Sequence, residues 1–273
     1  MTSMNILRPE IPEKFARYRK FLEENTRRTT ILKLRPVIVH GDKFPGYLSK
    51  SPAGSRIGGP ALVTDNFPWP VDSQGKPMMH MAQLNMAELP AREGYPTEGL
   101  LQFFHGNDDC YGITSTPNHV VRYIPAAELA HGRLHGTIAD QTDAIWDGYF
   151  EVTGQLFDQF PTGCDIETEN LELPDGLNDP NNDDDSERYE IFELNPSNTI
   201  FGGGWAYFTQ EDPRLYEKGL DDYRLLLQLD TETPEDGPVS MMFGDAGVAN
   251  FFIHPADLAA LNFDNVFYTW DCC

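Results

Sequence analysis

Two stretches decide the fold that we expect of this chain: GVANFF at residues 247–252 and GLLQFF at residues 99–104. Each stretch begins with a glycine, continues with two apolar residues and a side-chain amide, and ends with two phenylalanines. A glycine followed by a short apolar and aromatic run is typical of a strand that enters a buried sheet. We therefore expect both stretches to be central strands of the fold.

The sequence before the two stretches repeats in the same order. A Gln-Leu step precedes each of them, at Gln83 and at Gln228, and a pair of glycines lies about 25 residues before each glutamine, at Gly58-Gly59 and Gly202-Gly203. Self-similarity in order and spacing indicates an internal repeat. We interpret residues 51–160 and 190–273 as two related halves of one body.

The composition indicates a globular chain with a strongly acidic balance. Hydrophobic residues make up 40% of the 273 residues, which is enough for a sizeable core. The 43 acidic and 20 basic residues give a formal net charge of −23, and such a field repels the phosphates of nucleic acids and anionic lipids. We therefore expect no direct binding to nucleic acid or membrane, and we expect attraction of a basic protein. The alternative explanation for the acidity is solubility in a crowded cytosol.

Charge is distributed unevenly along the chain. Residues 1–50 contain eleven Lys and Arg against five Asp and Glu, whereas residues 165–190 contain eleven acidic residues and one base, Arg188. We expect the basic segment to form a helix and a strand that dock on a single body of residues 51–273. The acidic segment has too little apolar surface to bury, so we expect it to be an exposed loop that joins the two halves.

The remaining pattern predicts an α+β fold: a mostly antiparallel sheet built from the two halves, with an N-terminal helix and a few short helices. Apolar residues at spacings of three and four predict a helix over residues 10–25, and early prolines predict short helices over residues 125–129 and 255–261. Apolar runs predict strands over residues 29–40, 81–84, 99–105, 119–124, 223–229, 241–253 and 266–270. Residues 41–77 are expected to be a structured loop, and the pattern of residues 145–160 fits either a strand or a helix.

Three aspartates lie at the ends of the two central strands. Asp108 and Asp109 follow the first strand, and Asp245 precedes the second. If the strand ends of the two halves converge, these carboxylates can form a metal or acid–base site in a cleft between the halves, together with Gln83 and Gln228. The alternatives are turn formation for the aspartates and, for the buried amides, hydrogen bonds that fix strand register.

Histidine and cysteine positions favour no metal or cofactor site. His131 and His135 have the spacing of two ligands on one helical turn, but Gly132 occupies the position that metalloprotease helices fill with glutamate, so we expect an exposed loop. The cysteines are Cys110, Cys164, Cys272 and Cys273, and we interpret the last two as ordinary thiols rather than a strained disulfide. Low cysteine content, no signal-peptide core and no apolar run of membrane-spanning length predict a cytoplasmic protein.

Several motifs in a fixed order resemble the YwqG family of bacterial cytosolic proteins. They are Ile57-Gly58-Gly59, Phe67-Pro68-Trp69-Pro70, Ala82-Gln83-Leu84-Asn85, the GLLQFF stretch with Asp108-Asp109, Gly202-Gly203, and residues 225–230, 244–253 and 268–273. The resemblance runs from about residue 30 to residue 273. It implies no catalytic residues, because the biochemical function of the family is unassigned. It implies an immunity role, because members occur beside polymorphic and contact-delivered toxins.

The sequence therefore favours a non-catalytic acidic protein that binds and neutralises a cognate toxin. Toxins of the nuclease type are basic because they grip phosphate, and an acidic inhibitor can imitate that phosphate. The expected contact residues are Asp179, Asp183, Asp184, Asp185 and Glu187, with Tyr189 as an aromatic anchor. The alternative function is a small-ligand-binding protein or an enzyme that uses the carboxylates of the cleft. We expect neither a cofactor nor a bound metal.

Overall fold

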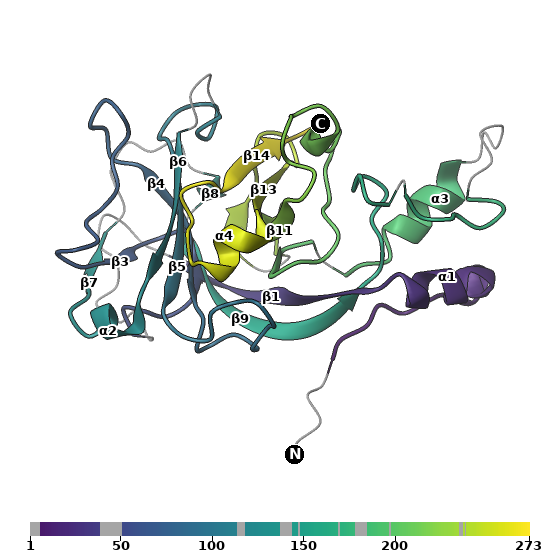
Figure 1. Ribbon diagram of the computed structural model, residues 1–273, viewed down its shortest axis with the longest axis horizontal. Helices are drawn as coiled ribbons and strands as arrows, with labels where there is room; N and C mark the ends of the chain where they lie inside the picture. Colours follow the sequence, from purple (N-terminus) through teal and green to yellow (C-terminus); the bar gives the residue numbers. More distant parts are fainter. Residues whose placement is uncertain are drawn as a thin grey trace, which may run out of the picture.

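A computed structural model of the chain describes residues 6–38, 51–113, 118–136, 144–146, 148–168, 170–177, 185–196, 198–234, 237 and 239–273, the first two residues of the 185–196 segment through their backbone alone. Its main feature is one antiparallel sheet of ten strands in the order β14-β13-β11-β10-β1-β9-β2-β4-β5-β6. The sheet curls into a nearly closed barrel, and the few helices lie around it and beyond one end of it (Figure 1).

The bounds of the elements follow the chain. The strands of the large sheet are β1 (Arg27–Ile38), β2 (Arg56–Ile57), β4 (Met79–Asn85), β5 (Leu100–His105), β6 (His119–Ile124), β9 (Gly148–Gln159), β10 (Ile200–Phe201), β11 (Arg224–Leu229), β13 (Val248–Ile253) and β14 (Phe267–Asp271). Two small sheets pair β3 (Ala61–Val63) with β7 (Arg133–His135), and β8 (Ile145–Trp146) with β12 (Ser240–Met241). The helices are η1 (Glu13–Tyr18), α1 (Arg19–Glu24), α2 (Ala126–Leu129), α3 (Asp185–Phe192), η2 (Pro213–Leu215) and α4 (Pro255–Ala259).

The two expected central strands are confirmed. GLLQFF contributes β5 and GVANFF contributes β13, and each of these strands is hydrogen-bonded to a neighbour on both sides. Their inward-facing phenylalanines meet across the barrel, with 5.0 Å between the ring centroids of Phe103 and Phe251. At the seam, His119 Nε2 at the start of β6 donates to the carbonyl oxygen of Val266 just before β14, at 2.7 Å. Among the described residues β6 and β14 are not paired as strands, and this hydrogen bond links the two edges of the sheet.

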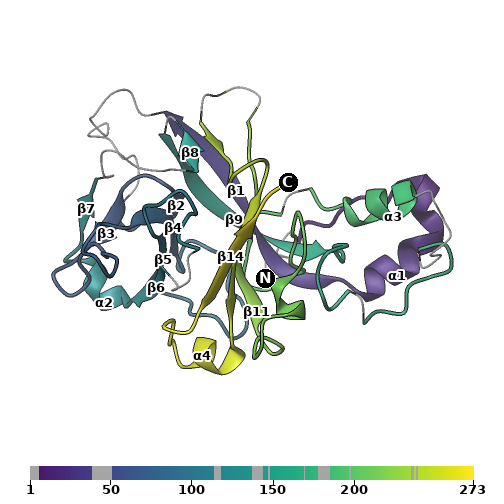
Figure 2. The same cartoon turned by 90° about the horizontal axis from the view of Figure 1, so that it is seen from above.

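The long pair of β1 and β9 forms the centre of the sheet. The register runs without a break from Arg27 opposite Gln159 to Ile38 opposite Gly148. One end of this pair projects beyond the barrel and carries α1 and α3, which lie side by side there (Figures 1 and 2). The sequence fitted two alternatives for residues 145–160, and the structure shows strand at residues 145–146 and 148–159.

Both glycine pairs have structural roles at the first turn after a short strand. Gly58 and Gly59 follow β2 with φ of 70° and 68°, and Gly202 and Gly203 follow β10 with φ of 82° and 87°. This left-handed region is one that L side chains rarely adopt. A Cβ on Gly59 would also lie 2.8 Å from the Cβ of Tyr149, so the first pair additionally allows close packing.

The structure corrects two expectations about loops. Within residues 41–77, the described part contains β2 and β3. Within residues 165–190, Asp165 is buried and α3 begins at Asp185, so the described parts of this acidic segment are not a simple exposed loop. The reason is that Leu171, Leu173 and Leu177 pack with residues after the segment, which together supply an apolar surface large enough to bury.

Among the residues that the structure describes, no helix combines the length and the apolar character that crossing a bilayer demands.

Candidate functional site

The candidate site is the helical lobe, which we define as η1, α1, residues 160–177 and α3. Pro12 precedes η1, and apolar residues at spacings of three and four then face one side of η1 and α1. The lobe has its own core, which is separate from the interior of the barrel. The buried members of this core are Phe15, Tyr18, Phe21, Leu22, Phe160, Leu177, Ile191 and Phe192.

The basic first helices and the acidic α3 are joined by ion pairs across the lobe. Lys14 pairs with Glu190, and Arg17 pairs with Glu187. The hydroxyl of Tyr18 also donates to Glu187 at 3.3 Å, and burial raises the pKa of Tyr18. Because both pairs are largely solvent-exposed, each contributes little to stability, and their main effect is to neutralise charge on this face.

Basic residues of β1 and of the segment before η1 are also paired. Asp158 on β9 is 5% exposed and accepts hydrogen bonds from Arg8 and Arg28. Arg27 pairs with Glu167 and lies over the ring of Trp205, 3.4 Å from its centroid. In the described residues 6–38, all Lys and Arg side chains except Lys33 form an ion pair with a carboxylate: Arg8, Lys14, Arg17, Arg19, Lys20, Arg27, Arg28 and Arg35.

The expected contact residues fall in and beside α3. Tyr189 is 67% exposed, so its ring is available to a partner. Glu187 is engaged by Arg17 and Tyr18 within the chain. Asp185 begins α3, but its side chain lies outside the described part of the chain, as do Asp179, Asp183 and Asp184 entirely.

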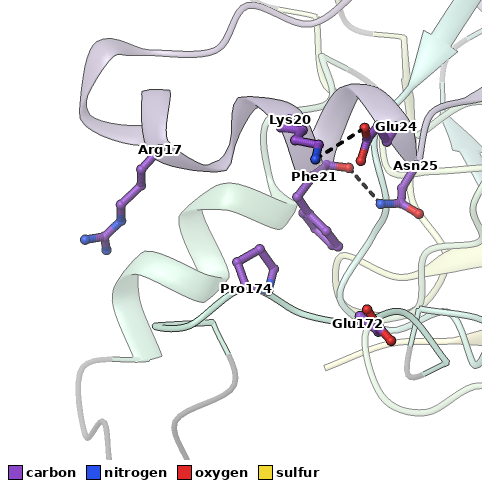
Figure 3. Close-up of a pocket in the computed structure, with 7 residues that line it drawn as sticks. All are labelled: Arg17, Lys20, Phe21, Glu24, Asn25, Glu172 and Pro174. Atoms are coloured by element: carbon purple, nitrogen blue, oxygen red, sulfur yellow. Dashed lines mark hydrogen bonds and ion pairs between the residues drawn. The ribbon is translucent and has the colours of Figure 1, made fainter.

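A hollow of about 450 Å³ lies between α1 and residues 172–174 (Figure 3). Its lining combines two cations with two carboxylates around one aromatic ring: Arg17, Lys20, Phe21, Glu24, Asn25, Glu172 and Pro174. Lys20 and Glu24 approach to 3.9 Å, and Asn25 Nδ2 donates to the carbonyl oxygen of Phe21 at 2.8 Å. Three of the four charged side chains in this lining are engaged in ion pairs, Arg17 with Glu187 and Lys20 with Glu24.

The three aspartates at the strand ends lie in turns at one end of the barrel. Asp108 Oδ1 accepts hydrogen bonds from the backbone N–H groups of Cys110 and Gly112 at 3.0 and 2.9 Å, as a turn-forming aspartate does. This turn meets the turn before β13, because Tyr111 packs against Phe243 and Trp270 with centroid separations of 5.6 and 5.1 Å. Asp109 and Asp245 are exposed there.

The glutamines of the alternative site, Gln83 and Gln228, are buried within their strands and face the segments that cover the sheet around Leu62 and Tyr207. Gln83 Oε1 accepts hydrogen bonds from Leu62 N–H and Gln102 Nε2, and Gln102 Nε2 also donates to the Leu62 carbonyl. In the second half, Gln228 Oε1 accepts from Tyr207 N–H at 2.8 Å, and Asn250 Nδ2 donates to the Tyr207 carbonyl at 3.0 Å. Each amide pair therefore holds one covering segment on the sheet, and the structure does not bring these amides together with the aspartates.

Sequence reasoning missed a buried ionic cluster in the second half. Arg214 donates to Asp212 at 2.6 Å and to Asp165 at 3.0 Å, and these three side chains are at most 3% exposed. Burial raises the pKa of Asp165, and Arg214 opposes that shift. Burial by itself lowers the pKa of Arg214. The net pKa is nevertheless raised, because the hydrogen bond and charge of Asp212 and the charge of Asp165 outweigh the effect of burial. In the sequence, the local sign of this ionic cluster is the Asp212-Pro213 step, in which an N-cap aspartate precedes a proline in the first turn of η2.

The two spaced histidines lie in different elements. His131 is exposed in the turn after α2, whereas His135 belongs to β7 and packs against Trp69 in a tilted arrangement with 4.7 Å between ring centroids. Within the described ranges, no group of three or more His, Cys, Asp or Glu side chains is placed to hold a metal ion. The four cysteines are free thiols.

Comparison with known proteins gives one family match. Residues 55–272 match the family model described as "Domain of unknown function (DUF1963)". The match covers every strand of the large sheet except β1, together with the acidic side of the helical lobe, and it begins after η1, α1 and β1. A search of curated proteins finds no match to the chain.

Proposed function

Since the chain belongs to the DUF1963 family, whose description assigns no activity, we propose a function from its own surface: it is a non-catalytic acidic binding protein that neutralises a basic bacterial toxin. The observation that carries the proposal is the internal pairing of its cations. The chain has a net charge of −23, and the bases of residues 6–38, apart from Lys33, are engaged by carboxylates of the same chain. The unpaired charge that a partner meets is therefore dominated by acid.

An acidic field of this size favours a basic partner in two ways. It raises the rate of encounter with a positive surface, and it repels proteins and polymers that carry negative charge. A toxin that grips nucleic-acid phosphate must present such a positive surface, and carboxylates can occupy it in place of phosphate. Blocking that surface requires no chemistry from the inhibitor.

The proposed contact face is the α3 side of the helical lobe. Tyr189 supplies an exposed aromatic ring of the type that anchors protein interfaces. Asp179, Asp183, Asp184 and Asp185 precede it in the most acidic part of the chain. Glu187 has a second role, because it already pairs with Arg17 of η1 and thereby neutralises charge between η1 and α3.

Three further statements belong to the same proposal. The chain is of the YwqG-like type within its family, and it acts in the cytoplasm. Residues 51–160 and 190–273 are two copies of one unit, with β2-β4-β5-β6 on one side of the β1–β9 pair and β10-β11-β13-β14 on the other. The mirrored strand orders β2-β4-β5-β6 and β10-β11-β13-β14 support the duplication, as do the matching amide pairs on Leu62 and Tyr207.

A protection assay tests the proposal. The proposal predicts a toxin gene beside the gene of this chain. The toxin domain that it encodes is expressed in a heterologous host with and without the chain, and growth is measured. We expect the chain to restore growth, and we expect Asp183→Lys, Asp184→Lys and Tyr189→Ala together to reduce protection. The matched control is Asp221→Lys with Asp222→Lys, two exposed aspartates outside the lobe. Toxicity that is unchanged by the wild-type chain contradicts the proposal.

A further inference from the structure

A second hollow lies where β14 ends beside η2, and none of its lining residues belongs to the helical lobe. We call it the β14 pocket, and its volume is about 500 Å³. Its lining holds two carboxylates and three aromatic rings, and no Lys, Arg or His is among the described residues that form it: Phe208, Gln210, Glu211, Tyr216, Thr269, Trp270 and Asp271. A hollow with acidic and aromatic walls is complementary to an organic cation.

One buried hydrogen-bond acceptor beside this pocket lacks a donor among the described residues. Asp271 accepts a hydrogen bond from Gln210 N–H through Oδ2 at 2.7 Å and is also hydrogen-bonded by Thr209. Asn250 is 0% exposed, its Oδ1 has no donor, and it lies directly across the strand pair from Thr269 in the pocket wall. Buried acceptors in native proteins are normally satisfied, so the Asn250 oxygen indicates a missing donor.

The first half of the chain shows which donor fits such a position. There, Gln102 lies across from Arg122, whose Nε donates to Gln102 Oε1 at 2.9 Å while its guanidinium lies over the Phe104 ring. In the second half, the residue across from Asn250 is Thr269, which carries no guanidinium.

Arg214 does not fill the gap. Its guanidinium lies over Phe252, but its hydrogen bonds go to Asp212, Asp165 and the Tyr223 carbonyl. The amide oxygen of Asn250 therefore stays without a donor.

We propose that the β14 pocket binds the guanidinium group of an arginine side chain presented by a basic protein partner. Glu211 and Asp271 accept its N–H groups, and Tyr216 and Trp270 supply ring faces on which the planar cation stacks. Arginine fits better than lysine because its five donors form a planar fork that satisfies several acceptors at once.

The rim of the pocket favours a protein over free arginine. Leu215 and Tyr216 are 48% and 62% exposed beside it, and such apolar side chains gain most when a protein surface covers them. The choice of partner rests on the proposed function, but the pocket does not depend on the helical lobe. Burial also raises the pKa of Asp271 in the free protein, and a bound cation would lower it again.

The experiment is an NMR titration of the full chain with the peptide Ac-Gly-Arg-Gly-NH₂. We expect saturable shifts of the Trp270 indole and Asp271 carboxyl signals with a dissociation constant of about 1–10 mM, which suits one side chain without its protein. The control peptide replaces arginine by citrulline, which has the same shape without the charge, and should not bind. Equal shifts with both peptides, or no saturable shift with either, overturn the proposal.

Three variants separate binding from folding. Asp271→Asn and Glu211→Gln keep the side-chain shapes and should each weaken the peptide at least about tenfold, as loss of one charge-assisted contact does. Thr269→Arg places a guanidinium across from Asn250, as Arg122 lies across from Gln102, and should block the peptide while the fold is retained. Unchanged peptide affinity in all three variants refutes the site.

The same variants distinguish this inference from the proposed function. If they leave the binding of the toxin domain unchanged while the Tyr189→Ala chain loses it, the β14 pocket is not part of the interface and the inference is wrong, but the proposed function stands. If Asp271→Asn and Glu211→Gln weaken the complex and Asp222→Asn does not, both hold. Failure of every chain, including the wild type, to bind the toxin domain contradicts the proposed function, and the peptide titration then decides the pocket alone.

Discussion

The buried ionic cluster around Arg214 gives the most demanding test of the second half of the fold. We consider Asp212→Asn, which preserves the shape of the side chain and removes its charge. In the native chain the Asp212 carboxylate accepts from Arg214 Nε at 3.0 and 3.1 Å and from Nη2 at 2.6 Å, and both side chains are excluded from water. The variant leaves the guanidinium buried, with Asp165 as the one carboxylate of the described residues that still forms an ion pair with it.

The expected loss follows from the cost of an incompletely compensated buried charge. Removing one partner of a buried pair destabilises proteins by about 3–5 kcal/mol. Asp165 stays in place and asparagine can still accept one hydrogen bond, so we expect the low end of that range, about 3 kcal/mol. With a urea m-value of about 3 kcal/mol per M, this corresponds to a midpoint lower by about 1 M.

The assay is urea unfolding at pH 7, followed by tryptophan fluorescence and repeated in 1 M NaCl. The matched control is Asp222→Asn, an exposed aspartate for which we expect a change below about 0.5 kcal/mol. Salt should leave the Asp212→Asn difference nearly unchanged, because a buried pair is poorly screened. A loss below about 1 kcal/mol, or one that disappears in high salt, would refute the reasoning and place the cluster in contact with solvent.

Three further outcomes follow from buried polar groups. Burial raises the pKa of Asp230 to about 6, so the folded state holds that proton more tightly than the unfolded state, and the chain loses stability as pH rises from about 4 to 6. Asp230→Asn should therefore stabilise the chain by about 1–2 kcal/mol at pH 7 and leave it unchanged at pH 3, as measured by urea midpoints. Burial lowers the pKa of His80 to about 3 and that of His105 to about 4. The free energy of unfolding should therefore fall as pH drops below about 6.5, by up to about 1.4 kcal/mol per pH unit for each residue. His105→Asn should flatten that slope, and a slope unchanged by this variant contradicts the burial. Gln228→Leu leaves the Tyr207 N–H without its acceptor and should cost about 1–3 kcal/mol, with faster hydrogen exchange at Tyr207 as the specific readout.

Local sequence was sufficient to predict the longer apolar strands and their antiparallel pairing, but not the short strands β2 and β3 within residues 41–77. The GLLQFF and GVANFF runs are central strands because continuous apolar stretches bounded by glycine can be buried on both faces. The amides inside them also follow from physical chemistry, because a buried amide must find partners and here it finds backbone groups of a covering segment. The closure of the sheet was not predictable, since it depends on His119 meeting a carbonyl far away in the sequence.

The acidic segment shows where composition misleads. Its average charge predicted a solvated loop, but Leu177 lies before the most charged stretch and Ile191 follows it, and together they cover the aromatic face of η1 and α1. Asp165 has no local feature that marks it for burial, because its partner Arg214 lies 49 residues away. Composition averages over such contacts and therefore cannot report them.

The candidate contact face was predictable only in part. Tyr189 is exposed, as an anchor must be, whereas Glu187 is engaged within the chain by a base that composition alone could not assign to it. The β14 pocket left no motif in the sequence, because its walls come from the end of β14 and from the segment around η2. Only the register of β13 with β14 brings Asn250 beneath it.

The central claim is that this chain acts through its acidic surface on a basic protein. The most direct measurement is the equilibrium affinity for the neighbouring toxin domain as a function of salt concentration, by titration calorimetry, for the wild-type chain and for Asp183→Lys with Asp184→Lys. The account predicts an affinity that falls steeply as salt rises, and a smaller salt dependence together with weaker binding in the variant. A tight complex that is insensitive to both salt and charge reversal would contradict it.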